Sequence, residues 1–95
     1  MDKEQILALL RSRKQELSAR YGVTRIGIFG SVARDEAAND SDVDIVVEMP
    51  PDLFLMVHMK EDLEAFLRTS VDLVRYQKHL SPLLKRRIDH DAIYV

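Results

Sequence analysis

The sequence contains no cysteine, and only three glycines and three prolines among its 95 residues. The lack of cysteine excludes disulfide bonds, thiolate zinc sites and cysteine nucleophiles. The three histidines do not have the spacing of a helical zinc motif. The longest nearly apolar stretch, residues 53–59, is much shorter than the roughly 20 residues that cross a membrane. The N-terminal residues also lack the basic and apolar regions of a signal peptide. We therefore expect a soluble, cytoplasmic protein that does not bind a membrane.

Charges of the two signs are nearly balanced. The chain has fourteen lysines and arginines and sixteen aspartates and glutamates, which gives a formal net charge of −2. A protein that binds nucleic acid by neutralising phosphates is usually basic, so we expect no direct nucleic-acid binding. Hydrophobic residues make up 46% of the chain and charged residues 32%, a balance typical of a folded domain and not of a disordered chain. At this length we expect a single domain spanning residues 1–95.

Helical and strand patterns alternate along the chain, which predicts helices covering a sheet. The predicted helices span residues 2–20, 32–38, 53–67 and 83–89, and the predicted strands span residues 24–29, 42–48, 70–76 and 92–95. Asp2 and Asp52 are expected to cap the N-termini of two helices, and Ser81 before Pro82 a third. Gly22 is expected to end the first helix. Residues 39–41 are predicted to form a turn.

Two aspartates on the second predicted strand form the first candidate site. Asp42 and Asp44 are two residues apart, so both carboxylates should leave the same face, with Cα atoms roughly 6–7 Å apart. Neighbouring carboxylates repel one another unless a cation lies between them. Mg²⁺ prefers such oxygen ligands and is commonly held by one or two carboxylates together with substrate phosphates. The pair therefore predicts metal-assisted phosphoryl or nucleotidyl transfer.

A turn between the first strand and the next helix forms the second candidate site. Gly30 permits a tight turn and a close approach of the backbone to a ligand. The first N–H groups of the following helix would point at an anion. The Ser31 hydroxyl can donate to a phosphate oxygen, and the Arg34 guanidinium, one helical turn later, can reach the same anion. If the first two strands are neighbours, the phosphate site and the metal site share one edge of the sheet.

Asp72 is a charged residue in an otherwise apolar strand. As a third carboxylate beside the pair, it could bind a second metal ion or take the proton from an attacking hydroxyl. Taken singly, each feature has a simpler reading: Gly-Ser is a loop, Asp-x-Asp is common on solvated strands, and Asp72 is a surface or ion-paired residue. The four fixed positions of the first two features arise together by chance in on the order of one chain in a thousand of this length. Their combination favours a functional site.

The pattern Gly30-Ser31, ten intervening residues, then Asp42-x-Asp44 resembles the signature of the polymerase-beta-type nucleotidyltransferase superfamily. The fuller form Gly-Ser-x-Ala-Arg … Ser-Asp-x-Asp-Ile resembles its smallest members, the minimal nucleotidyltransferases. The resemblance implies an α+β fold with a small mixed sheet covered by helices. It also implies that Asp42 and Asp44 bind one or two Mg²⁺ ions, and it matches Asp72 to the third catalytic and metal-binding carboxylate. Gly30 and Ser31 match the turn that holds the nucleotide phosphates.

The resemblance further implies a protein acceptor. Larger relatives carry a second domain that grips the acceptor, and 95 residues leave no room for one. Minimal nucleotidyltransferases are often encoded beside a helical HEPN-type toxin. The implied role is that of an antitoxin that binds this toxin and transfers AMP from ATP to a toxin tyrosine.

One predicted helix carries more apolar surface than a small core needs. Residues 53–59 are apolar almost all round, and the surplus around Phe54, Leu55, Val57 and Met59 fits a protein interface. Burial on both sides, or packing in a homo-oligomer, fits equally well. The basic run at residues 85–87 could attract phosphates or an acidic partner, but we expect it to be a solvated helix face.

Three functions are compatible with these observations. The first is an active enzyme that modifies a partner protein. The second is a binding module that neutralises its partner by complex formation, with vestigial chemistry. The third is nucleotidyl transfer to a small-molecule hydroxyl. The presence of all three carboxylates favours the first function, and the lack of an acceptor domain disfavours the third.

Overall fold

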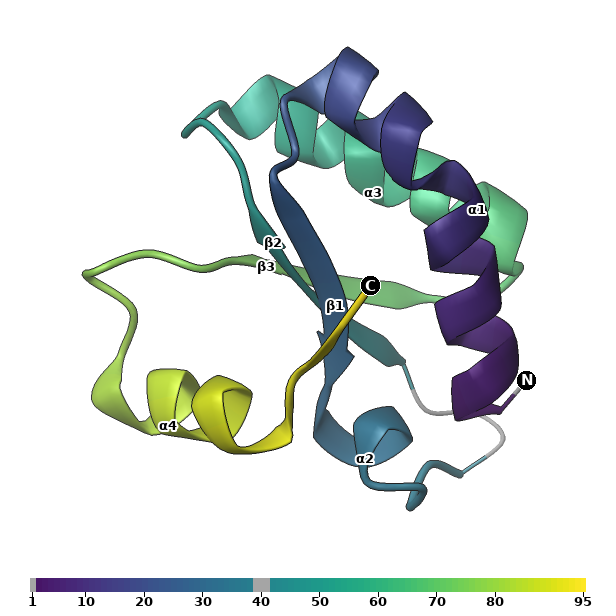
Figure 1. Cartoon of the computed structure of the whole chain (residues 1–95). Helices are drawn as coiled ribbons and strands as arrows, with labels where there is room; N and C mark the ends of the chain where they lie inside the picture. The colour runs from purple at the N-terminus through teal and green to yellow at the C-terminus, as the bar shows by residue number, and fades with distance from the viewer. Residues whose placement is uncertain (1, 39–41) are drawn as a thin grey trace.

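The described residues form a mixed sheet with helices on both faces (Figure 1). The computed structural model describes residues 2–38 and 42–95, so the turn predicted at residues 39–41 lies outside the described residues. The strands are β1 (Arg25–Phe29), β2 (Val43–Glu48), β3 (Val71–Arg75) and β4 (Ile93–Tyr94). Their order is β3-β2-β1-β4, with β1 antiparallel to β2 and β4, and β2 parallel to β3. The α+β fold and its small mixed sheet are therefore confirmed.

The described helices, except the second, begin at capping residues that the sequence marks. They are α1 (Lys3–Tyr21), α2 (Gly30–Ala33), α3 (Leu53–Leu67) and α4 (Pro82–Asp91). The side chains of Asp2, Asp52 and Ser81 each accept a hydrogen bond from a backbone N–H of the first turn of α1, α3 and α4. Gly22 closes α1 in the left-handed conformation. None of the described helices is both long enough and apolar enough to cross a membrane.

The prediction for the second helix was wrong in extent. A helix was expected over residues 32–38, whereas α2 is a single turn that begins two residues earlier and ends at Ala33. Asp35 has a φ of 59°, in the left-handed region, where a right-handed helix cannot continue. An ion pair between Lys3 Nζ and Asp35 Oδ2, 3.0 Å long, ties this segment to α1.

One face of the sheet packs against α1 and α3 and forms the larger core. Ile26, Ile28, Ile45 and Val47 are the strand residues fully buried there, as their alternation predicts. Met59 of α3 is also fully buried in this core. The inclusion of Met59 in the surplus apolar surface was therefore wrong, because this residue lies about half a turn after the exposed Val57 and faces the sheet. Leu55 is likewise partly buried against this core.

The opposite face carries a smaller apolar cluster under α4. Phe29, Val46 and Ile88 are fully buried in it. Val46 leaves β2 on the same face as Asp44, two residues earlier, because side chains alternate along a strand. Helix α4 therefore lies over the face of the sheet from which Asp44 projects.

Candidate functional site

The pairing of β2 with β3 places two of the predicted catalytic residues side by side. In this parallel register Asp44 lies directly opposite Asp72. Residues opposite each other on neighbouring strands project from the same face of the sheet. Asp42 precedes β2 immediately and lies two residues before Asp44. Asp44 is half-buried, whereas Asp42 and Asp72 are exposed.

Electrostatics show that these acidic groups act on one another. The pKa of Asp44 is raised to about 6, mainly by burial and then by the negative charge of Asp72, with smaller contributions from a hydrogen bond with Asp72 and the charge of Asp42. The positive charge of Arg87 on α4 acts in the opposite direction. Asp44 is therefore the centre of a small acidic group that local cations do not fully neutralise.

The turn predicted to hold phosphates lies directly against Asp44. β1 ends at Phe29, which pairs with Asp44 across the antiparallel register. Gly30 follows with a φ of 72°, where a side chain would strain the backbone. A Cβ at position 30 would overlap Asp44 Oδ2 and lie 3.1 Å from Asp44 Cγ. The two candidate sites predicted from the sequence therefore share one edge of the sheet.

Ser31 and Arg34 are placed differently by the same short helix. Ser31 follows Gly30 directly and is half-buried. Arg34 directly follows α2 as its C-terminal cap residue. Its guanidinium contacts Asp91 and Glu36, with Nη1 2.6 Å from Asp91 Oδ2 and Nε 3.2 Å from Glu36 Oε2. Ser31 is therefore at the turn itself, whereas the Arg34 side chain extends to the C-terminal end of α4. Their contact with a nucleotide stays a prediction.

Arg87 lies near the site, although the sequence analysis named it only as part of the basic run at residues 85–87 and did not link it to the carboxylates. It is exposed, as predicted for the basic face of α4, yet its charge acts on Asp44. It reaches this position because the neighbouring Ile88 anchors α4 on the Phe29 cluster. The sequence carries no local signal for this placement, because it depends on how α4 packs on the sheet.

The acidic group fits a hard divalent cation by the chemistry of its donors. Carboxylate oxygens are the ligands that Mg²⁺ prefers, and the mutual repulsion around Asp44 is what a cation would relieve. Among residues 2–38 and 42–95, no three His, Cys, Asp or Glu side chains already stand in the arrangement that holds a metal ion. The assignment of Asp42, Asp44 and Asp72 as metal ligands therefore stays a prediction that rests on their chemistry and register.

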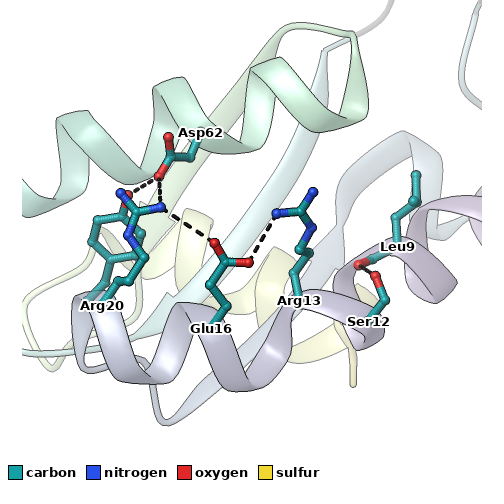
Figure 2. Close-up of polar contacts among 7 residues, drawn as sticks. Leu9, Ser12, Arg13, Glu16, Arg20 and Asp62 are labelled. Carbon is teal, nitrogen blue, oxygen red and sulfur yellow. Dashed lines mark hydrogen bonds and ion pairs between the residues drawn. The ribbon is translucent and has the colours of Figure 1, made fainter.

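A cavity of about 270 Å³ lies between α1 and α3, on the face of the sheet away from Asp44. Figure 2 shows that its charged side chains pair with one another. Glu16 accepts from Arg13 at 3.0 Å and contacts Arg20 at 3.6 Å, and Arg20 lies 3.0 Å from Asp62 of α3. Tyr21 donates a further hydrogen bond to Asp62. Because these charges compensate each other, the network is explained as a contact between the two helices and not as the active site.

The raised pKa of Asp44 predicts a stability that depends on pH. An unfolded aspartate has a pKa of about 3.9, so the folded chain binds more protons between about pH 4 and pH 6. This contribution to the free energy of unfolding is therefore fully present below pH 4 and is lost as the pH rises through about 6. Urea unfolding in EDTA gives the free energy of unfolding of the wild type and of Asp44→Asn. The difference between the two should change in favour of Asp44→Asn as the pH rises from 4 to 7. An unchanged difference over this range would contradict the assignment.

Three comparisons place this geometry among known proteins. The nucleotidyltransferase domain family matches residues 10–95. The protein adenylyltransferase MntA of Thermococcus cleftensis is 40% identical over 94 residues, which cover 97% of this chain and 94% of that protein. A solved structure assigned to the minimal nucleotidyltransferases is 38% identical, with a TM-score of 0.78 and coverage of 98% and 95% of the two chains.

A second solved structure shows the same fold at lower identity. It is the complex of a tri-AMPylated HEPN toxin of Shewanella oneidensis with an MNT antitoxin. The match has a TM-score of 0.68 and 18% identity, and covers 97% of this chain and 70% of that one. At this identity the likeness establishes the fold alone.

Proposed function

Because the chain belongs to the nucleotidyltransferase domain family and is a nucleotidyltransferase, we propose that it transfers AMP from ATP to a partner protein. The observation that carries this proposal is the position of Asp44, beside Asp72 and directly against the Gly30 turn. The 40% identity to a protein adenylyltransferase over nearly the whole chain supports AMP as the transferred group and a protein as the acceptor.

Each part of the site has a role in this proposal. The turn of Gly30 and Ser31 holds the triphosphate through backbone N–H groups and the serine hydroxyl. Asp42, Asp44 and Asp72 hold Mg²⁺, which when bound offsets the negative charge of carboxylates and phosphates and polarises the reacting phosphate. The acidic side chains thus attract the cation, and the turn fixes the nucleotide beside them.

The reaction at the α-phosphate is a displacement. The acceptor hydroxyl oxygen forms a bond to the α-phosphorus, and the bond from this phosphorus to the oxygen that bridges to the β-phosphate breaks. Pyrophosphate leaves with that oxygen, and AMP remains on the acceptor. Asp72, an exposed carboxylate at this edge, accepts the proton of the attacking hydroxyl.

We propose a tyrosine of a HEPN-type toxin as the acceptor and an antitoxin role for the chain. The likeness in fold to an MNT antitoxin bound to an AMPylated HEPN toxin supports this choice. The test is incubation of the chain and its partner with ATP labelled at the α-phosphate. Label should join the partner covalently with Mg²⁺ and not with EDTA, and peptide mapping should place it on tyrosine. Equal labelling in EDTA would contradict the role given to the metal.

An exposed apolar surface on α3 favours a second candidate function, neutralisation of the partner by binding alone. Leu53 and Phe54 are 74% and 80% exposed, and Val57 is exposed one turn later; we name these three residues the α3 apolar patch. Single exposed apolar residues are ordinary, but three on adjacent turns suit a protein interface. If binding alone neutralises the toxin, Asp44→Asn should still protect cells. If AMP transfer is required, that variant should fail.

Substitution in the α3 apolar patch tests whether this surface contacts the partner. Phe54→Glu places a charge where an interface would exclude water, and we expect affinity for the partner to fall at least about tenfold. Calorimetry with the purified partner measures this change. Leu83→Glu is the matched control, because Leu83 is 69% exposed on α4, outside the patch. Equal losses in both variants, or none in Phe54→Glu, would show that the patch is not the interface.

A further inference from the structure

A carboxylate at the C-terminal end of α4 holds the arginine of the phosphate turn. The Asp91 side chain is only 4% exposed, and its Oδ2 lies 2.6 Å from Arg34 Nη1. Its other oxygen, Oδ1, lies 2.7 Å from His90 Nδ1. The hydrogen bonds of His90 and then of Arg34 hold the pKa of Asp91 below its ordinary value. Asp91 is therefore a nearly buried, charged group with both oxygens in use.

The sheet topology brings Asp91 to the turn. β4 enters the sheet antiparallel to β1 with Ile93 opposite Ile28. Asp91 lies two residues before Ile93, and Gly30 lies two residues after Ile28, so the end of α4 and the start of α2 meet at one corner of the sheet. The contact of Arg34 with Asp91 spans this corner.

From this geometry we propose that Asp91 is a positioning residue for nucleotide binding and acts by fixing the Arg34 guanidinium. The inference rests on the proposed function. A guanidinium carries five N–H donors in a planar fork. Within the described part of the chain, Arg34 contacts Glu36 through Nε and Asp91 through Nη1. The donors of Nη2 are left for a phosphate oxygen. An arginine already held in place loses less conformational freedom when it binds an anion.

The two carboxylates that contact Arg34 differ in a way that assigns the positioning role to Asp91. Glu36 is 64% exposed and lies only two residues from Arg34, so solvent screens this pair and it constrains the arginine little. Asp91 is screened far less and comes from a separate helix that packs on the sheet through Ile88. The contact therefore fixes Arg34 relative to the whole site.

The experiment is a double-substitution cycle on the full chain, with calorimetric Kd values for ATP in Mg²⁺ and thermal unfolding of each variant. Asp91→Asn and Arg34→Gln should each raise the Kd about tenfold, the size expected for a charge-assisted hydrogen bond. Because Asp91 acts through Arg34, the double variant should bind no worse than Arg34→Gln alone. Asp89→Asn is the matched control, since this exposed aspartate of α4 contacts Tyr76 and not Arg34.

Several results would overturn the inference. Wild-type affinity in Asp91→Asn would mean that Asp91 does not position Arg34, and tighter binding would mean that Asp91 withholds Arg34 from the nucleotide. If adding Asp91→Asn to Arg34→Gln raises the Kd for ATP by the same factor as Asp91→Asn does alone, Asp91 does not act through Arg34. If Asp91→Asn fails to fold, Arg34→Lys is measured in its place, because lysine keeps the positive charge but lacks the planar fork of donors. Wild-type affinity of Arg34→Lys for ATP would refute the inference. A wild type that binds no ATP would refute the proposed function as well, whereas intact binding with these results would refute the inference alone.

Discussion

Replacing Asp44 by asparagine is expected to lower AMP transfer at least about a hundredfold, because loss even of a group that only supports a metal ligand often costs 10- to 100-fold. Asp44 is the acidic residue that lies beside Asp72 and against Gly30, so its charge is central to the proposed metal site. The measurement is the rate of label transfer from α-labelled ATP to the partner in Mg²⁺.

The control for this prediction separates chemistry from folding. Asp89→Asn makes the same change of charge on the exposed surface of α4 and should transfer AMP at the wild-type rate. At pH 7, the unfolding temperature of Asp44→Asn should equal or exceed that of the wild type. The substitution removes a carboxylate whose charged form is disfavoured by burial and by its acidic neighbours. Full activity in folded Asp44→Asn would remove Asp44 from the mechanism.

A methyl group at position 30 is expected to damage both the fold and the site. Gly30→Ala forces a side chain into the left-handed region, which costs about 1–2 kcal/mol of stability. The new Cβ would also overlap Asp44 Oδ2, so the carboxylate must rotate away from its place beside Asp72. We expect a lower free energy of unfolding together with a loss of AMP transfer close to that of Asp44→Asn.

Gly22→Ala is the matched control for this substitution. Gly22 has a φ of 73°, nearly that of Gly30, but it ends α1, where a Cβ would meet only Pro50 at 3.1 Å. A similar loss of stability with retained AMP transfer in Gly22→Ala would assign the activity loss of Gly30→Ala to the displaced Asp44. Retained activity in Gly30→Ala would mean that the turn tolerates a side chain and does not hold Asp44 in place.

The sequence predicted the parts of the fold that local rules determine. The capping groups at Asp2 and Asp52 and the left-handed Gly22 satisfy backbone groups within a few residues, so their positions can be read directly. The length of α2 was predicted wrongly, because its end depends on the left-handed Asp35, and aspartate adopts that conformation only in particular surroundings.

In the candidate site, too, some features follow from local rules and others depend on how distant elements pack. Alternation along a strand is a local rule, and in β2 it places Asp44 on the same face as Val46, which is buried with Phe29, the residue opposite Asp44. The in-register pairing of Asp44 with Asp72 depends on a parallel strand 28 residues away, and local spacing does not determine it. The contact of Arg34 with Asp91 depends on two elements meeting at a corner of the sheet, and neither residue carries a local signal for it.

The measurement that tests the account most directly is a calorimetric titration of ATP into the chain, with Mg²⁺ and with EDTA, for the wild type, Asp44→Asn and Asp72→Asn. We predict that Mg²⁺ strengthens ATP binding to the wild type, and that both variants remain folded but lose this strengthening. The same effect of Mg²⁺ in all three proteins would contradict the claim that these neighbouring carboxylates and the Gly30 turn form one nucleotide and metal site.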